Sequence, residues 1–409
     1  MDELKIRNYA KLIAIVGANI QKGQEAFVIA NVEVAPFVEI LVEELYKAGA
    51  SYVEVQWQNN KVNVLTNNFA SFDIMSHLRD TDKAFHEHNI KVKPARIWID
   101  SDDPHASDGI DLKRRNEALA IKGKEVRAYR DQYDDECQWC IAGVPSKRWA
   151  KTVFPNLNEE EAVEKLWEYI LITSRAYEGD PIKNWEIHDK NLVNHMNLLN
   201  NLKLQKLHYT SKNGTDLYVE LLDEVIWEAG GENTKTEKIR FQPNIPTEEC
   251  FTSPNKFKTE GIVYSTKPLN YNGMLIENFS IRFKEGKAVE VHAEKGEEAL
   301  KQMINLDENA CYLGECALVA YHSPINDLNT IFFSTLYDEN ASCHLALGDS
   351  FPNLIKNYDK MSKEELKALP LNNSIVHTDF MIGSKDLNII GTTKDGQEIQ
   401  IFKDGDWRI

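Results

Sequence analysis

The sequence has no long run of apolar residues. Its 409 residues are 42% hydrophobic and 27% charged, which is typical of a globular protein. The apolar residues that follow the charged N-terminus are spaced as one face of a helix: Leu4, Tyr9, Leu12, Ile13 and Val16. We therefore expect neither a signal peptide nor a membrane span.

Positive charge is also scarce. The chain has 47 Lys and Arg residues against 64 Asp and Glu residues, a formal net charge of −17, and the acidic residues are spread along the chain. Because phosphate contacts need clustered Lys and Arg, nucleic acid is not an expected partner. An acidic surface suits metal ions and small cationic or zwitterionic substrates.

Cysteine is too sparse for a disulfide framework. Six cysteines are scattered through a long chain, which favours a reducing cytoplasm. Cys137 and Cys140 have CxxC spacing, but no second CxxC follows to complete a zinc site. A redox pair and two core thiols both stay open, and core thiols are favoured.

Motifs that bind nucleotide phosphates are absent as well, since neither GxGxxG nor GxxxxGK(S/T) occurs. The first half of the chain instead alternates strand and helix patterns. The expected strands are 26–30, 51–57, 95–100 and 139–143, and the expected helices are 34–48 and 113–131. Such alternation predicts an α/β N-terminal domain with a mostly parallel sheet over residues 1–205.

The pattern changes near residue 206. Helical segments at 159–176 and 182–204 are followed by short strands and by the turn dipeptides Asn213-Gly214 and Asn272-Gly273. We expect a β-rich α+β C-terminal domain over residues 206–409. Six candidate metal ligands, Glu249, Glu315, Glu339, His344, His377 and Asp379, all lie in this second domain, so we expect it to be the catalytic, metal-binding domain.

The most informative segment is the strand-like stretch from Ile375 to Gly383. Alternate side chains of a strand point to opposite faces, so His377 and Asp379 share one face. The other face carries Val376, Thr378, Phe380 and Ile382. A largely apolar back with an imidazole and a carboxylate in front is typical of a strand that presents metal ligands to a cavity.

Four further residues offer ligands of the same kind. Glu315 is a single carboxylate in an apolar run, and charges are rarely buried unless they are paired or metal-bound. A buried ion pair is the alternative for Glu315, and a satisfied core histidine is the alternative for His344. Glu249, after a proline-bounded loop, and Glu339 complete the group. The predicted ligands are Glu249, Glu315, Glu339, His344, His377 and Asp379.

The ligand types narrow the choice of metal. Imidazole and carboxylate ligands without cysteine suit Zn²⁺, Co²⁺ or Mn²⁺, and Mg²⁺ is a further candidate. Two metal ions roughly 3.5–4 Å apart need about this many ligands, usually with one bridging carboxylate. Because such a pair activates water and stabilises an oxyanion, the sequence predicts hydrolytic chemistry.

Several motifs resemble the thermophilic-type aminopeptidases, the family of aminopeptidase T and aminopeptidase S. The similarity is colinear over essentially the whole chain. It rests on Trp185-Glu186-Ile187-His188, Pro246-Thr247-Glu248-Glu249, Gly314-Glu315, His344-Leu345-Ala346-Leu347-Gly348 and His377-Thr378-Asp379-Phe380-Met381-Ile382-Gly383. The resemblance implies a cytoplasmic, homodimeric metallo-exopeptidase with two divalent metals, held by the six residues named above and bridged by Glu315.

The sequence departs from this family pattern at one position. The pattern has a tyrosine in the active site after the His-x-Ala-Leu-Gly block, and the matching residue here is Phe351. A phenol could donate a hydrogen bond to the oxyanion, whereas Phe351 cannot, so either another donor serves or activity is reduced. Tyr358 is a substitute only if its loop folds back toward the site.

The expected function is removal of N-terminal residues from peptides with a free N-terminus. Glu315 is the expected bridging carboxylate, and Glu248 is the expected base or amine anchor because it adjoins a ligand and has no ligand role itself. One alternative is a two-metal hydrolase of another bond, such as a phosphoester. A second alternative is a non-catalytic, metal-stabilised peptide-binding protein.

Overall fold

The computed structural model describes residues 2–101, 103–271 and 274–409. Within them the chain divides into two compact units, one of Met1–Ile187 with Gly231–Pro246 and one of His188–Gly230 with Thr247–Ile409. The predicted turn at Asn272-Gly273 lies outside the described residues. Among the described helices, none is both long enough and apolar enough to cross a membrane.

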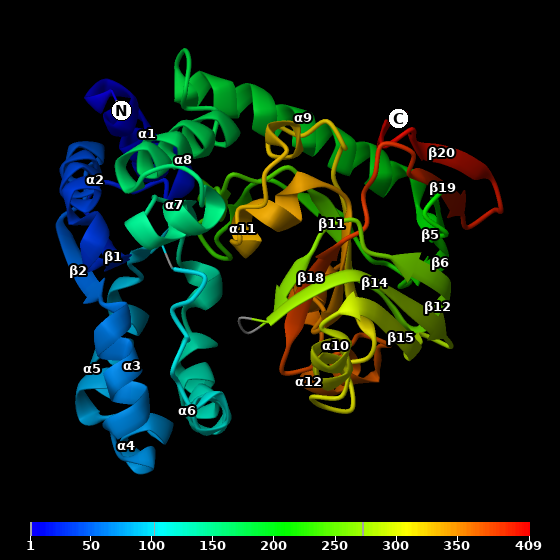
Figure 1. Cartoon of the computed structure of the whole chain (residues 1–409), viewed down its shortest axis with the longest axis horizontal. Helices are drawn as coiled ribbons and strands as arrows, with labels where there is room; N and C mark the ends of the chain where they lie inside the picture. Colours follow the sequence, from blue (N-terminus) through cyan, green and yellow to red (C-terminus); the bar gives the residue numbers. More distant parts are fainter. Residues whose placement is uncertain (1, 102, 272–273) are drawn as a thin grey trace. The chain divides into compact units, whose positions relative to one another are not determined.

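The first unit contains a parallel sheet, in the strand order β10-β4-β3-β1-β2, with helices between its successive strands (Figure 1). Its elements are α1 (Glu3–Leu12), β1 (Glu25–Asn31), α2 (Ala35–Ala48), β2 (Tyr52–Gln58), α3 (Asn60–Phe69), α4 (Phe72–Ser76), α5 (Asp80–Val92), β3 (Ala95–Asp100), α6 (Leu112–Arg130), β4 (Trp139–Gly143), α7 (Lys147–Val153), α8 (Glu159–Thr173), β8 (Glu232–Asn233), β9 (Arg240–Phe241) and β10 (Asn244–Ile245). The predicted α/β class with a mostly parallel sheet is confirmed.

Local sequence explains how helix α2 forms and how the chain turns from it into β2. Helix α2 buries Phe37, Leu41 and Leu45, which repeat at helical spacing, and it contacts β1 and β2. The helix ends at Gly49, whose φ of +119° is a left-handed conformation that favours glycine. The Gly49 amide donates hydrogen bonds to the carbonyls of Leu45 and Tyr46, which satisfies the helix end and directs the chain into β2.

The CxxC cysteines are core thiols. Cys137 and Cys140 are both buried and free, beside and within β4. Burial raises the pKa of Cys137 to about 11 and raises that of Cys140 further still. Because reactivity needs the thiolate, these two residues lack the electropositive, accessible setting of a redox pair.

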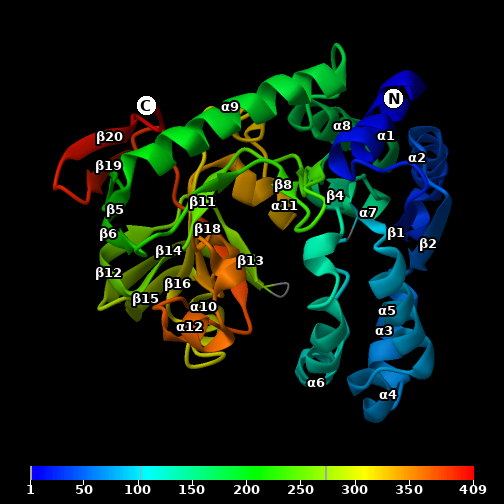
Figure 2. The ribbon, with the colours of Figure 1, turned by 180° about the vertical axis from the view of Figure 1, so that it is seen from behind.

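The second unit is β-rich, with two antiparallel sheets in the orders β18-β17-β16-β11-β7 and β13-β14-β12-β6-β5-β19-β20-β21, and β15 also pairs with β14 (Figures 1 and 2). Its elements are β5 (Leu204–Thr210), β6 (Asp216–Leu221), β7 (Glu228–Ala229), β11 (Cys250–Thr252), β12 (Pro254–Tyr264), β13 (Leu269–Tyr271), β14 (Met274–Lys284), β15 (Lys287–Lys295), α10 (Glu297–Ile304), β16 (Leu313–Leu318), α11 (Thr335–Asp338), β17 (His344–Gly348), α12 (Lys363–Ala368), β18 (His377–Met381), β19 (Asn388–Thr393), β20 (Glu398–Lys403) and β21 (Asp406–Trp407). The predicted α+β character of this half is confirmed, and Asn213-Gly214 lies in the β5–β6 hairpin.

The compact units and the predicted domains differ at their edges. The division falls at His188, inside the single helix α9 (Pro181–Leu202), rather than after residue 205. Leu192 and Leu199 of α9 belong to the core of the second unit, so the last turns of this helix pack with the sheet that follows. Residues 231–246 return to the first unit because Asn244 and Ile245 pair with β4.

Candidate metal centre

The register of three neighbouring strands places four of the predicted ligands on one face. Ala346 of β17 pairs with Glu315 on β16 and with Asp379 on β18. His377 precedes Asp379 by two residues and His344 precedes Ala346 by two, so both imidazoles share the face of the two carboxylates. The predicted shared face of His377 and Asp379 is therefore part of a larger array.

The opposite face of the same strands is apolar. It is formed by buried residues of the core cluster of the second unit: Cys316, Leu318, Leu345, Leu347, Phe380 and Ile382. On the ligand face, the positions between the charged residues are filled by small residues, Ala317, Ala346 and Gly348. Small side chains leave room above the sheet, while the apolar back anchors the strands.

The two remaining predicted ligands come from neighbouring segments. Glu249 directly precedes β11, the strand that pairs with β16. Glu339 begins the short 3-10 helix Glu339–Ala341 that follows α11. Glu249 and Glu315 are almost fully buried, at 9% and 4% exposure, so neither is simply solvated.

The ligand atoms form two triads that share Glu315. One triad is Glu249, Glu315 and His344, the other is Glu315, His377 and Asp379, and the atoms of each lie within 4.8 Å of one another. The Nε2 atom of His377 lies 3.0 Å from Oε2 of Glu315 and 3.3 Å from Oδ1 of Asp379. The Nε2 atom of His344 lies 3.2 Å from Oε2 of Glu249. Glu339 lies in neither triad, although the charges of both act on it.

Main-chain carbonyls orient both imidazoles. The Nδ1 atom of His377 donates to the carbonyl of Asp349 at 2.8 Å, and Nδ1 of His344 donates to that of Ser342 at 3.3 Å. Each Nε2 atom is thereby directed at the carboxylates, which is the arrangement that metal-ligating histidines usually have. These carbonyl partners were not predicted, because a main-chain oxygen leaves no residue-type signal.

Close approach of the backbone holds the Asp349 carbonyl in place. A Cβ atom on Gly314 would collide with that carbonyl, and a Cβ atom on Gly348, where φ is +108°, would collide with the carbonyl of Val376. Only glycine fits at these two positions. Gly314 therefore makes room for the Asp349 carbonyl that orients His377, and the next residue, Glu315, is itself a predicted ligand.

The electrostatics of the cluster are dominated by excess carboxylates. Burial raises the pKa of Glu315 to about 7, against the lowering effect of its hydrogen bond with His377. Burial, followed by the charges of Asp379 and Glu249, raises the pKa of Glu339 well above its usual range. Although burial lowers the pKa of His344, the hydrogen bond and charge of Glu249 raise it to about 10.

The pKa of His377 is raised as well. Its burial lowers the pKa, but the hydrogen bonds with Asp379 and Glu315 outweigh burial and raise the pKa to about 12. Burial acts to raise the pKa of Asp379, and the interaction with His377 reverses that effect and lowers it. Both imidazoles thus carry protons in a cation-free cluster, where they partly neutralise the acids.

The donor set fits divalent cations. Four carboxylates face two imidazoles, so protonation of both imidazoles offsets only two of the four, and burial together with this excess of acidic groups raises the pKa values of Glu315 and Glu339. The buried carboxylate of Asp379 shares the single Nε2 atom of His377 with Glu315. Because burying unpaired charge is costly, oxygen and imidazole ligands gathered in this way favour bound cations.

The predicted catalytic residue Glu248 lies beside this ligand set. Its amide donates to Oδ1 of Asn340 at 2.8 Å, and its carboxylate Oε2 lies 3.8 Å from Nε2 of His188. The His188 ring also hydrogen-bonds the carbonyl of Thr247 at 2.7 Å. Asn340 and His188 are site neighbours that the residue pattern alone did not assign.

Phe351 lies against a predicted ligand. Its ring centroid is 5.1 Å from that of His377 and 5.5 Å from that of Phe251. The position where the family resemblance implies a phenol therefore does face the cluster, and here it offers only an apolar surface. Tyr358 lies in the 3-10 helix Tyr358–Lys360, and its role as a substitute donor stays a prediction.

Comparison with known proteins identifies the family. Residues 2–407 match the family described as thermophilic metalloprotease (M29). The chain belongs to the M29 family. It is 42% identical to aminopeptidase AmpS of Bacillus subtilis, over 98% of each chain. It is 40% identical to aminopeptidase 2 of Geobacillus stearothermophilus, over 99% of this chain and 98% of that protein.

A solved structure of this family has the same fold. AmpT from Thermus thermophilus matches with a TM-score of 0.89 at 33% identity, over 100% of both chains. The predicted family is therefore confirmed, and M29 membership makes the chain a metalloprotease. The assignment of individual ligands stays a prediction that rests on the geometry described above.

Proposed function

We propose that this protein is a metal-dependent aminopeptidase that removes N-terminal residues from peptides, using two divalent metal ions. The observation that carries the proposal is the pair of ligand triads sharing Glu315, in a chain of the M29 metalloprotease family. The names of its relatives, aminopeptidases AmpS and 2, support the exopeptidase activity.

The six predicted residues would hold the metals. Glu249 and His344 would serve one ion, His377 and Asp379 the other, with Glu315 as the bridge and Glu339 completing the set. Zn²⁺, Co²⁺ or Mn²⁺ suit these ligands, and Mg²⁺ is a further candidate. When bound, the ions supply an activated water nucleophile and electrostatic stabilisation of the oxyanion.

Glu248 would act beside the metals rather than on them. Its amide is held by Asn340, and its carboxylate is mostly buried next to His188. From that position it would either accept a proton from the attacking water or bind the free α-ammonium group of the peptide. Phe351 packs against His377 and would help to fix that imidazole without donating a proton.

We predict that replacing Glu248 with glutamine lowers kcat/KM for a leucyl p-nitroanilide by roughly 10²-fold or more, as loss of a general base does. A fall confined to kcat would indicate the base, whereas a rise in KM would indicate the amine anchor. Glu220→Gln, which removes an exposed carboxylate paired with Lys258, is the control. Unchanged kinetics in Glu248→Gln would rule out both roles.

The proposal predicts strict dependence on a free N-terminus. Leucyl p-nitroanilide should be cleaved, and its N-acetylated counterpart should be cleaved at least about 10³-fold more slowly, because a buried partner of the ammonium group would be left unpaired. Cleavage of both compounds would indicate a different peptidase specificity. Cleavage of neither by the metal-loaded protein would favour the binding-protein alternative, and turnover of a phosphoester would favour the other hydrolase.

We further propose a cytoplasmic homodimer. The six cysteines are all free, which suits a reducing compartment. Helix α3 exposes Val62, Leu65 and Phe69 along one side, and Phe69 is 81% exposed, so this helix offers an apolar surface for a second copy. A light-scattering mass near twice the 46.9 kDa of one chain would match the proposal.

A further inference from the structure

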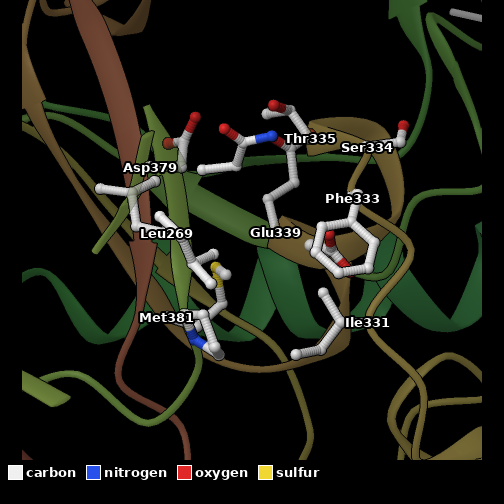
Figure 3. Close-up of a pocket in the computed structure, with 12 residues that line it drawn as sticks. Leu269, Ile331, Phe333, Ser334, Thr335, Glu339, Asp379 and Met381 are labelled. Atoms are coloured by element: carbon white, nitrogen blue, oxygen red, sulfur yellow. The ribbon is translucent and has the colours of Figure 1, made fainter. Parts of the chain in front are cut away.

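A cavity of about 100 Å³ opens beside two of the predicted ligands, within the second unit (Figure 3). Glu339 and Asp379 form its polar end. The remaining lining comes from the segment around β13, the start of β14, the loop before α11, α11 itself and β18, and it includes Leu269, Leu275, Ile331, Phe333, Asp338 and Met381.

The walls away from Glu339 and Asp379 combine apolar side chains with the polar side chains of Asn270, Ser334 and Thr335. Figure 3 shows the Glu339 side chain reaching into the space that Leu269, Ile331, Phe333 and Met381 surround. An apolar recess with a few polar groups at one end is typical of a ligand subsite.

One wall is held in a strained backbone conformation. Phe333 has a φ of +57°, which is uncommon for a bulky residue. The buried carboxylate of Asp338 accepts a hydrogen bond from the amide of Phe332 at 2.8 Å, and it also accepts from the amides of Phe333 and Ser334. The Phe332 ring stacks on Tyr337, with centroids 4.8 Å apart. These contacts fix the loop, so the Phe333 wall exists before any ligand enters.

We infer that this cavity receives the side chain of the N-terminal residue of the substrate and selects aliphatic side chains of the size of leucine or methionine. The inference rests on the proposed aminopeptidase function. In such a substrate the α-amino group and the scissile carbonyl flank the Cα atom of the first residue. When both groups reach the ligand cluster, the side chain is left to enter the space beside Glu339 and Asp379.

Size and charge define what the cavity accepts. Its volume of about 100 Å³ is smaller than the roughly 150 Å³ apolar cavity that holds benzene, so an indole does not fit. The acidic side chains of Asp338, Glu339 and Asp379 in the lining repel a carboxylate. Alanine fits but leaves most of the apolar wall in contact with water. Leucine and methionine fill the space.

The test compares alanyl, leucyl, glutamyl and tryptophanyl p-nitroanilides. For the wild type, kcat/KM for the leucyl compound should exceed that for the alanyl compound at least about 10-fold, with the other two lower still. Ile331→Trp fills the cavity, so the leucyl value should fall at least about 10-fold while the alanyl value stays within about 3-fold. Val289→Trp, at an exposed position of β15, is the matched control and should change neither.

A second variant covers the case in which Ile331→Trp does not fold. Leu269→Ala enlarges the cavity and should raise kcat/KM for the tryptophanyl compound relative to the leucyl compound at least about 5-fold. Equal changes for all substrates in the variants, or no leucine preference in the wild type, would overturn the inference. A wild type that cleaves none of the four compounds would instead overturn the proposed function on which the inference rests.

Discussion

Glu315→Gln should lower kcat on a leucyl p-nitroanilide by about 10³-fold or more, a loss of roughly 4 kcal/mol of transition-state stabilisation. Glutamine keeps the size of the side chain and removes the charge. Glu315 is the residue that belongs to both ligand triads, so its neutral replacement weakens both predicted metal positions together. Replacing a residue of one triad alone leaves the other triad with its full charge.

Metal content and fold should be measured on the same Glu315→Gln sample. We expect fewer bound ions per chain and a far-ultraviolet circular dichroism spectrum like that of the wild type, because the strand keeps its apolar back against the core. Glu220→Gln is again the matched control, since its carboxylate is exposed and pairs with Lys258. Full activity in Glu315→Gln with unchanged metal content would contradict the bridging assignment.

Removing the metal should have an effect of similar size. Dialysis against a strong chelator should lower activity at least about 10³-fold, and Zn²⁺, Co²⁺ or Mn²⁺ should restore it. The pKa values of His344 and His377 are raised to about 10 and about 12 in the cation-free cluster, so both imidazoles are protonated at neutral pH. Metal binding must displace those protons, and the apparent affinity should therefore rise with pH.

Calorimetry can check this linkage directly. Titration of the metal-free protein with Zn²⁺ in buffers of different ionisation enthalpy should show protons released on binding. His344→Ala should reduce the number released, because one protonated ligand is gone. Full activity in the chelated protein would contradict the dependence on metal, and metal binding without proton release would contradict the raised pKa values of the two histidines.

The sequence was most informative where residue types that bind metals recur at the spacing of a strand. His377 and Asp379 alternate with apolar residues, and this spacing alone predicted both the strand β18 and the face on which the two side chains lie. Glu315 was visible as a charge within an apolar run, and β16 is indeed buried along its length. Both signals are local, so a single sequence carries them.

The parts that escaped prediction depend on long-range packing. Asp349 and Ser342 act through main-chain carbonyls, and Asn340 and His188 meet Glu248 only after distant segments come together. The return of residues 231–246 to the first unit rests on strands of two residues each, which are too short to show a period. The edge at His188 lies within a continuous helix, where composition does not change.

The most direct test is a crystal structure of the protein soaked with zinc, with anomalous scattering used to locate the ions. Our account predicts two anomalous peaks, one contacting Glu249 and His344 and one contacting His377 and Asp379, with Glu315 contacting both. Glu339 should contact one of the two ions. A single peak, or peaks that lie away from Glu315, would contradict the two-metal centre.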